Sequence, residues 1–314
     1  MPPAPPPARV PAPIPYQGSK RRLATRLLAL LPRDAGVLHE PFCGSAALSL
    51  AALSVEAVER VVLNDANAPL MALWSRLVSD PEALAADYAA LWWAQQGCSR
   101  EFYDDRRREF NATRRPELLL FLLARCAKSA VRYNARGEFN QSPDNRRLGA
   151  HPERMAARVR GAARLLGGRC ALSADDYRVA LRAAGPDDVS YLDPPYQGVS
   201  AARDRRYHAG LDLAGFVAAL EQANRARLSY LVSFDGRTGA RRHGEELPAH
   251  LALARIEVEA GRSSQATLLG RVERTVESLY LSPALVERLG GPAECARRLA
   301  SADAERPQPG CRAR

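Results

Sequence analysis

The sequence predicts an α/β fold in which a mostly helical stretch interrupts the sheet. Short apolar, strand-like segments alternate with helical segments near both ends of the chain, while apolar positions recur at helical spacing from about residue 69 to 165. The chain has 314 residues, and 46% of them are apolar, which is enough to bury a substantial core. We therefore expect one large domain with an insertion, or two domains.

The first 13 residues are rich in proline and predict a disordered arm, because they lack the apolar core of a signal peptide. Apolar residues at helical spacing between Ser19 and Leu31 then predict a helix, which Pro32 ends. The chain contains no run of 18 apolar residues, so we expect no membrane span. Its six cysteines are scattered and do not cluster with histidines, which predicts free thiols, a cytoplasmic location and no metal site.

A pattern typical of nucleotide-binding proteins comes next. A short buried strand at 36–40 leads into a turn that contains Gly44, and a small-residue helix follows. A second strand at 60–65 ends on Asp65, 21 positions after Gly44, near the spacing at which an acidic residue meets a ribose. Gly44 is thus expected to let the backbone approach a cofactor, and Asp65 to accept hydrogen bonds from its ribose hydroxyls.

The middle of the chain is rich in arginine, and the net charge of the whole chain is +10, which favours a polyanionic partner. Turn residues from Asn134 to Gly137, set between aromatic residues, predict a hairpin or loop within the helices. The only lysines are Lys20 and Lys128, which draws attention to both positions.

After the insertion the strand pattern returns, and helical stretches such as 213–225 separate some of the strands. The last dozen residues, from 303, read as a loose tail. The expected strands lie at 170–173, 189–192, 229–234, 251–258 and 275–281.

The segment Asp193-Pro194-Pro195-Tyr196, directly after the strand at 189–192, has the parts needed for chemistry on the amino group of a flipped base. The Asp193 carboxylate can accept a hydrogen bond from the amine, and a rigid proline turn can aim the Pro194 carbonyl at the same nitrogen. Tyr196 can stack on the base. These four residues are the predicted catalytic set.

Four blocks in order make the chain resemble the Dam-like DNA adenine N6-methyltransferases, which use S-adenosylmethionine. The resemblance covers most of residues 14 to 283 and implies a Rossmann-like, class I S-adenosylmethionine-dependent methyltransferase sheet with an inserted, mostly helical target-recognition domain. It implies catalytic parts at 14–68 and 166–302, with the recognition insertion at 69–165. The blocks are Pro15–Lys20, Glu40–Ala46, Arg132–Asn140 and Asp193–Tyr196.

This resemblance also implies roles for individual residues. Asp193 is expected to contact the cofactor as well as the target amine. Asp176, or alternatively its neighbour Asp175, is expected to accept a hydrogen bond from the amine of the cofactor's adenine. Lys20 pairs with the methionine carboxylate or approaches the catalytic site. The remaining expected cofactor residues are Tyr16, Glu40, Phe42, Gly44 and Asp65. The residues themselves suggest the DNA contacts: Asn134 and Arg136, in the predicted hairpin, are expected to bind DNA together with Lys128 and Arg132. Arg203, Arg205 and Arg206, just after the catalytic turn, either clamp phosphates beside the flipped base or form a plain solvated charge run.

Arg132 has the fork geometry for bidentate contact with guanine, and base readout is favoured over the alternative of a phosphate contact. The chain departs from the family at two points. Ala46 replaces the second glycine of the cofactor turn, where its methyl group either crowds the cofactor or seats the helix. Ala127 and Lys128 replace the Tyr-Asn pair of GATC readers, which argues against GATC as the target.

The sequence thus predicts a site-specific adenine N6-methyltransferase that acts on double-stranded DNA as a monomer, with a cognate restriction endonuclease as a further partner left open. Methylation of cytosine N4 or of RNA adenine is the alternative activity, and Asp at position 193 favours adenine. A catalytically silent DNA-binding relative is the third interpretation. Intact Asp193–Tyr196 and Asp65 argue against it.

Overall fold

The computed structural model describes residues 10–195, 211–238, 241–262 and 274–304. It contains one mixed sheet in the order β3-β2-β1-β4-β5-β8-β7, and β6 pairs with β5 at its end. The first five strands in this order are parallel, whereas β8 is antiparallel to both β5 and β7. The strands are β1 (Val37–Glu40), β2 (Arg60–Asn64), β3 (Cys170–Ser173), β4 (Val189–Leu192), β5 (Tyr230–Thr238), β6 (Arg241–His243), β7 (Ala254–Arg262) and β8 (Arg274–Leu281).

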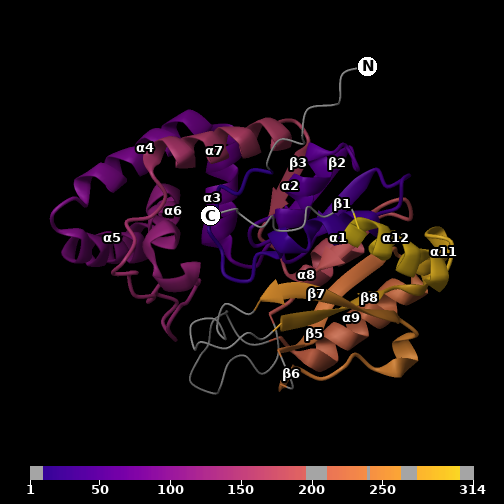
Figure 1. The fold of residues 1–314 in the computed structure, drawn as a ribbon. Helices are drawn as coiled ribbons and strands as arrows, with labels where there is room; N and C mark the ends of the chain where they lie inside the picture. The colour runs from indigo at the N-terminus through magenta and orange to yellow at the C-terminus, as the bar shows by residue number, and fades with distance from the viewer. Residues whose placement is uncertain (1–9, 196–210, 239–240, 263–273, 305–314) are drawn as a thin grey trace, which may run out of the picture.

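Helices cover both faces of the sheet, and α4, α5 and α6 gather to one side of it (Figure 1). From there α7 runs back toward β3. The helices are α1 (Ala24–Ala29), α2 (Ala47–Ser54), α3 (Ala68–Ser79), α4 (Pro81–Ala94), α5 (Ser99–Thr113), α6 (Pro116–Arg125), α7 (Pro152–Leu166), α8 (Tyr177–Arg182), α9 (Leu213–Arg225), α11 (Pro283–Arg288) and α12 (Pro292–Ala304). Three short 3₁₀ segments are η1 (Lys20–Arg22), η2 (Ala127–Ser129) and η3 (Ala249–Leu251).

Two apolar cores lie on the opposite faces of the sheet, as the alternation of side chains along the strands requires. Tyr191 and Leu231 belong to the larger core, whereas their neighbours Leu192 and Val232 belong to the smaller one with α9. All four residues of β4 are buried, which explains why this strand is a continuous apolar run in the sequence.

A buried arginine at the end of α6 links two segments of the helical region that lies between β2 and β3 in the chain. Arg125 is 2% exposed, and its Nε donates to Gln95 Oε1 at 2.5 Å. Its Nη1 donates to the carbonyl oxygen of Asp144 at 2.8 Å, so one side chain joins the end of α4 to the loop that precedes α7. With these partners inside the protein, the Arg125 guanidinium has a structural role and is not placed to bind DNA.

The sheet and the helices at 47–54 and 213–225 agree with the sequence pattern, and three differences have simple causes. Pro11, expected in a disordered arm, lies against α7, where Gly161 leaves room: a Cβ there would be 3.3 Å from the proline ring. The helix α12 extends to Ala304, into the expected tail, and Arg26 pairs with Asp303. The short strand β6 was not predicted, because three residues are too few for a periodic signal.

None of the helices in the described ranges combines the length and apolarity needed to cross a membrane. Within the same ranges, His, Cys, Asp and Glu side chains form no group of three or more arranged to hold a metal ion.

Candidate functional site

The predicted site residues come together at the carboxyl edge of the parallel strands. The strand order reverses between β1 and β4, and open α/β sheets bind their ligands in the crevice at such a switch point. Glu40 is the last residue of β1, and Asp193 follows the last residue of β4. Two blocks that are about 150 positions apart in the sequence therefore flank one crevice.

The turn after β1 is built closely around Gly44. This residue has a φ of 46°, in the left-handed region that favours glycine. A Cβ added there would lie 3.1 Å from Cε1 of Tyr16, so the tyrosine ring covers the turn. The backbone nitrogen of Gly44 donates to Asp65 Oδ2 at 3.1 Å, and Trp74 Nε1 donates to its carbonyl at 3.0 Å. The segment with Tyr16 and the glycine turn thus form one unit.

Two further hydrogen bonds attach the segment before η1 to this edge. Ser45 Oγ donates to Ser19 Oγ at 2.8 Å, and the nitrogen of Gln17 donates to the carbonyl of Ser129 at 2.9 Å. Ser129 and Lys128 both have a positive φ, of 51° and 60°. Two consecutive non-glycine residues in this region are strained, and such strain clusters at functional sites.

Ala46 occupies the position where the family has a second glycine. Its φ of 48° is left-handed, which costs roughly 1 kcal/mol for a residue with a side chain. The residue is fully buried in the larger core at the start of α2. Of the two outcomes expected for the methyl group, the structure therefore favours seating the helix.

Asp65, directly after β2, holds two backbone turns at once. Its Oδ2 accepts from Gly44 and its Oδ1 from the nitrogen of Asn67 at 3.0 Å. Burial raises the pKa of Asp65 above its ordinary value, and these two backbone hydrogen bonds oppose the rise. A carboxylate has about four acceptor positions, so two remain for a ligand.

Sequence reasoning missed Asn64, the residue before Asp65. This side chain is fully buried, and its Nδ2 donates to the carbonyls of Pro41 and Asp175, both at 3.0 Å. Its Oδ1 accepts from the Asp175 nitrogen at 2.8 Å and from Ser173 Oγ at 2.7 Å. One amide therefore satisfies all its hydrogen-bonding capacity by joining the segments that follow β1, β2 and β3. An asparagine at the end of an apolar strand is the only sequence signal it left.

Lys20 is buried beside the predicted catalytic carboxylate. Its Nζ lies 2.9 Å from Asp193 Oδ1 and 3.5 Å from Glu277 Oε2, and the lysine side chain is 7% exposed. Burial raises the pKa of Asp193 to about 6, Lys20 lowers it, and Glu277 raises it. Lys20 thus lies beside Asp193, the position that the second of its two expected roles, approach to the predicted catalytic site, requires. Glu277, on β8, is a second residue that the sequence did not single out.

Glu40 lies deeper in the same crevice. It is 3% exposed, and its Oε1 accepts from the backbone nitrogen of Ser49 in the first turns of α2 at 2.7 Å. Burial raises the pKa of Glu40 to about 7, and the negative charge of Asp193 adds to the rise. Glu40 thus adds a third carboxyl group to the crevice beside Asp193 and Glu277, the two carboxylates that contact the Lys20 ammonium.

The segment after β3 places Asp175 and Asp176 differently. Asp176 caps α8 by accepting from the Arg178 nitrogen at 2.9 Å, and it also pairs with the Arg178 guanidinium at 2.7 Å. Asp175 is exposed, and its backbone is fixed by Asn64. The ring of Phe42 stacks on Tyr177 at the start of α8 with centroids 5.0 Å apart, and both rings are partly buried against the smaller core.

The predicted hairpin is a loop closed by one bridge between Tyr133 and Phe139. The Asn134 amide stabilises its turn, because Oδ1 accepts from the nitrogens of Arg136 and Glu138 and Nδ2 donates to Glu138 Oε2 at 2.7 Å. Arg136, at the tip, has a side chain that is 84% exposed, and its pair with Glu138 is as long as 3.8 Å. Arg136 is thus better placed than Asn134 to reach an external partner.

A hydrogen bond also links this loop to the crevice, since Tyr133 donates to Asn67 Oδ1 at 3.2 Å. Asn67 in turn is held by Asp65. The recognition candidates and the cofactor candidates are therefore connected through buried side chains. Arg132 is half-buried in the same loop, and Lys128 is exposed beside Ser129.

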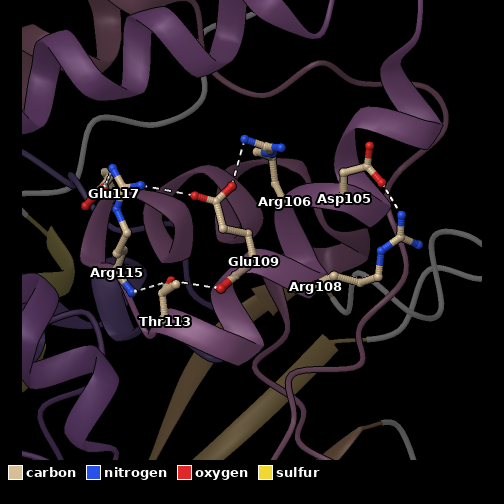
Figure 2. Close-up of polar contacts among 7 residues, drawn as sticks. All are labelled: Asp105, Arg106, Arg108, Glu109, Thr113, Arg115 and Glu117. Atoms are coloured by element: carbon tan, nitrogen blue, oxygen red, sulfur yellow. Dashed lines mark hydrogen bonds and ion pairs between the residues drawn. The ribbon is translucent and has the colours of Figure 1, made fainter.

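Arginines on α5 and in the turn between α5 and α6 are balanced by carboxylates, as Figure 2 shows. Arg106 pairs with Glu109 at 2.7 Å, Arg115 pairs with Glu109 at 3.0 Å, and Arg108 pairs with Asp105. Exposed pairs of this kind are each worth about 1 kcal/mol or less, so a phosphate can compete for these arginines. The arginine-rich sequence of the insertion is nevertheless not a bare cationic surface along α5.

Four of the predicted site residues lie outside the described residues, and the structure says nothing of their placement. They are Tyr196, Arg203, Arg205 and Arg206.

The fold and this site define an α/β protein in which a glycine turn, buried carboxylates and a buried lysine meet at the switch point of the sheet. Residues 16–216 match the family model described as D12 class N6 adenine-specific DNA methyltransferase. The match spans more than half of the chain, and the chain belongs to this family. Family membership confirms both the predicted resemblance and the predicted activity, N6 methylation of adenine in DNA.

Individual relatives carry corresponding names. A DNA adenine methylase of Serratia marcescens is 28% identical over 271 residues, which cover 82% of this chain and 93% of that protein. A DNA adenine methylase of Haemophilus influenzae is 27% identical over 202 residues, or 62% of this chain and 67% of that protein. The DNA N-6-adenine-methyltransferase of Escherichia phage P1 is 26% identical over 231 residues, which cover 70% of this chain but 29% of the phage protein.

Proposed function

We propose that this chain transfers a methyl group from S-adenosylmethionine to the N6 amine of an adenine flipped out of double-stranded DNA at a specific sequence. The observation that carries the proposal is the position of Asp193, whose carboxylate lies at the sheet's switch point with Lys20 at 2.9 Å. The finer fold assignment, a class I methyltransferase sheet with a target-recognition insertion at 69–165, belongs to the same proposal.

The crevice fits a nucleoside cofactor. A glycine with positive φ allows close approach of the backbone, and Asp65 keeps acceptor capacity for two ribose hydroxyls. The ring of Tyr16 packs against the turn at Gly44. Either Asp175 or Asp176 accepts from the adenine amine, and the capping role of Asp176 favours Asp175. S-adenosylmethionine, when bound, supplies an electrophilic methyl group on its sulfonium sulfur.

The chain's own contribution is to prepare the target amine. The lone pair of adenine N6 is delocalised into the ring, which makes it a poor nucleophile. Hydrogen bonds from the amine to the Asp193 carboxylate and the Pro194 carbonyl favour a pyramidal nitrogen whose lone pair is directed at the methyl group. Pro195 keeps the turn rigid, and Tyr196 stacks on the flipped base. This is catalysis by positioning and electrostatics, with the amine proton lost during or after transfer.

A labelled-methyl transfer assay tests the proposal directly. Tritiated S-adenosylmethionine and the protein are incubated in parallel with a DNA and with an RNA of diverse sequence, and the modified base is identified after digestion. N6-methyladenine in a defined sequence context is the expected product. Label in cytosine or in RNA would show one of the alternative activities, and no label with an intact, folded protein would show the silent relative.

Asp65→Ala is expected to weaken S-adenosylmethionine binding by about 2–4 kcal/mol, because two hydrogen bonds to a charged acceptor are lost. The structure adds that Gly44 and Asn67 lose their acceptor as well, so a lower unfolding midpoint is expected too. Calorimetry measures the binding and thermal melting the stability. Ser173→Ala, which removes one nearby hydrogen bond, is the control. Unchanged affinity in a folded Asp65→Ala protein would place the cofactor elsewhere.

In the recognition loop, Arg132→Ala is expected to relax sequence preference by roughly 1–3 kcal/mol, the worth of a bidentate arginine–guanine pair. Arg136→Ala tests whether the exposed tip reads bases or contacts a phosphate. Loss of a phosphate contact would lower affinity for all sequences alike and make binding less dependent on salt concentration. Affinity is measured across a salt series for two duplexes, one that contains the sequence the wild-type enzyme methylates and one in which that sequence is scrambled. Arg227→Ala is the control. Arg227 lies just before β5, at the amino ends of the parallel strands and so away from the predicted site, and it pairs with Glu287 of α11.

A further inference from the structure

The ammonium group of Lys20 lies between two carboxylates that come from different parts of the fold. Asp193 follows β4, and Glu277 lies on β8, where it shares a face of the sheet with Leu279 and Leu281 of the larger core. The Nζ to carboxylate distances are 2.9 Å to Asp193 and 3.5 Å to Glu277. The exposed fractions of the three side chains are 7%, 21% and 16%, so the trio is largely out of water.

This arrangement raises a difficulty for the reaction. The target amine needs the Asp193 carboxylate as a strong acceptor, yet the Lys20 ammonium already contacts Oδ1, holds the carboxylate's orientation and offsets its negative charge. A charged donor makes a hydrogen bond roughly twice as strong as a neutral one, so a neutral adenine amine competes poorly with it. Moving the ammonium away from every carboxylate inside the crevice would carry a large desolvation cost.

Glu277 removes that difficulty, because a small rotation of the lysine side chain exchanges one carboxylate for the other. We propose that Glu277 is a second binding position for the Lys20 ammonium, to which Lys20 moves when the target amine arrives at Asp193. Glu277 is thus a positioning residue, which acts on the substrate through Lys20. The inference rests on the proposed function, because it needs an amine that Asp193 accepts.

The charges around Asp193 come from three directions. Lys20 faces it from η1, Glu277 from β8 and Glu40 from the end of β1. Burial raises the pKa of Asp193, Lys20 lowers it and Glu277 raises it. Loss of the Glu277 charge therefore removes a repulsion and a competitor for the Lys20 ammonium, and both changes lower the pKa of Asp193.

The lysine composition allows a direct test, because Lys20 and Lys128 are the only lysines. Protein labelled with ¹³C and ¹⁵N at lysine gives two side-chain signals, which Lys128→Arg assigns. S-adenosylhomocysteine and a duplex that the wild-type enzyme methylates are then added. The Lys20 signal is expected to shift in the wild-type protein and to shift much less in Glu277→Gln. A shift of equal size in both proteins overturns the proposal.

Kinetics provide a readout that a purely structural role would not change. Glu277→Gln is expected to lower kcat/KM for DNA about fivefold, the scale of one ion pair. In the profile of kcat/KM against pH, the rise on the acidic side (the acid limb) should move to lower pH. Cofactor affinity should stay unchanged. In a Lys20→Met background the same substitution should have no further effect on kcat/KM measured at a pH above the acid limb, where Asp193 is ionised in every variant. An equal loss in both backgrounds, or an unshifted acid limb, overturns the proposal. Wild-type turnover is measured first, since its absence would instead contradict the proposed function.

Discussion

Asp193→Ala is expected to abolish methyl transfer while cofactor and DNA binding stay close to wild type. The carboxylate acts on the amine as the nitrogen becomes nucleophilic, so its loss raises the barrier without removing most ground-state contacts. A loss of at least about 10³-fold in kcat, or about 4 kcal/mol, is the scale expected for one preorganised group at the reacting atom. In the variant Lys20 keeps Glu277 as a partner, so the fold should survive.

Single-turnover assays with labelled cofactor measure this loss, and calorimetry with gel-shift titration measures binding. Asp193→Asn is the matched variant, because it keeps the size of the side chain but replaces a charged acceptor with a neutral amide. It should retain more activity than alanine and far less than aspartate. Turnover within a few-fold of wild type in the alanine variant would remove Asp193 from the catalytic assignment.

The same carboxylate predicts a pH dependence. Asp193 accepts the amine hydrogen bond only when ionised, and burial raises its pKa to about 6. The kcat/KM should therefore increase as pH rises through about 6, since this profile reports the free enzyme. Burial likewise raises the pKa of Glu40 to about 7, and the two carboxylates influence each other. The pH at which kcat/KM rises therefore reports the titration of both groups together. A flat profile between pH 5 and 8 would contradict the assignment.

The sequence was most informative where the chain repeats a local pattern. The run Val189–Leu192 is apolar because both faces of β4 are buried, and Gly44 is a glycine because φ is positive there and Tyr16 lies above it. Such requirements act on one residue at a time, which makes them readable without a structure. The order of glycine turn and Asp65 therefore predicted their meeting at one edge of the sheet.

Contacts between distant segments could not be predicted in this way. Glu277 is one acid in a strand of mixed residues, and only the pairing of β8 with β5 brings it to Lys20. Asn134 was expected to bind DNA on the strength of its position in a turn, but its amide is engaged by the turn itself. Polar side chains can bind inward or outward from the same sequence, and tertiary packing decides which.

Asn64→Ala is the second substitution with a large expected effect, and it acts on stability and cofactor binding together. Four hydrogen bonds join this amide to Pro41, Ser173 and Asp175, and the side chain is fully buried. Its removal leaves several buried polar groups without partners, and each costs about 1–3 kcal/mol, so a loss of roughly 3–5 kcal/mol in the free energy of unfolding is expected.

Urea unfolding measures that free energy, and calorimetry with S-adenosylmethionine measures binding in the residual folded protein. Ser173→Ala removes one of the four bonds by deleting the hydroxyl that donates to Asn64, so it should cost about 1 kcal/mol and leave cofactor affinity nearly unchanged. Asn64→Asp keeps the size and the two acceptor contacts but faces the carbonyls of Pro41 and Asp175 with a carboxylate, so it should be at least as harmful as alanine. If both Asn64 variants lose less than about 1 kcal/mol, the amide does not hold the three strand ends together, and the geometry of the cofactor edge must depend on the turns themselves.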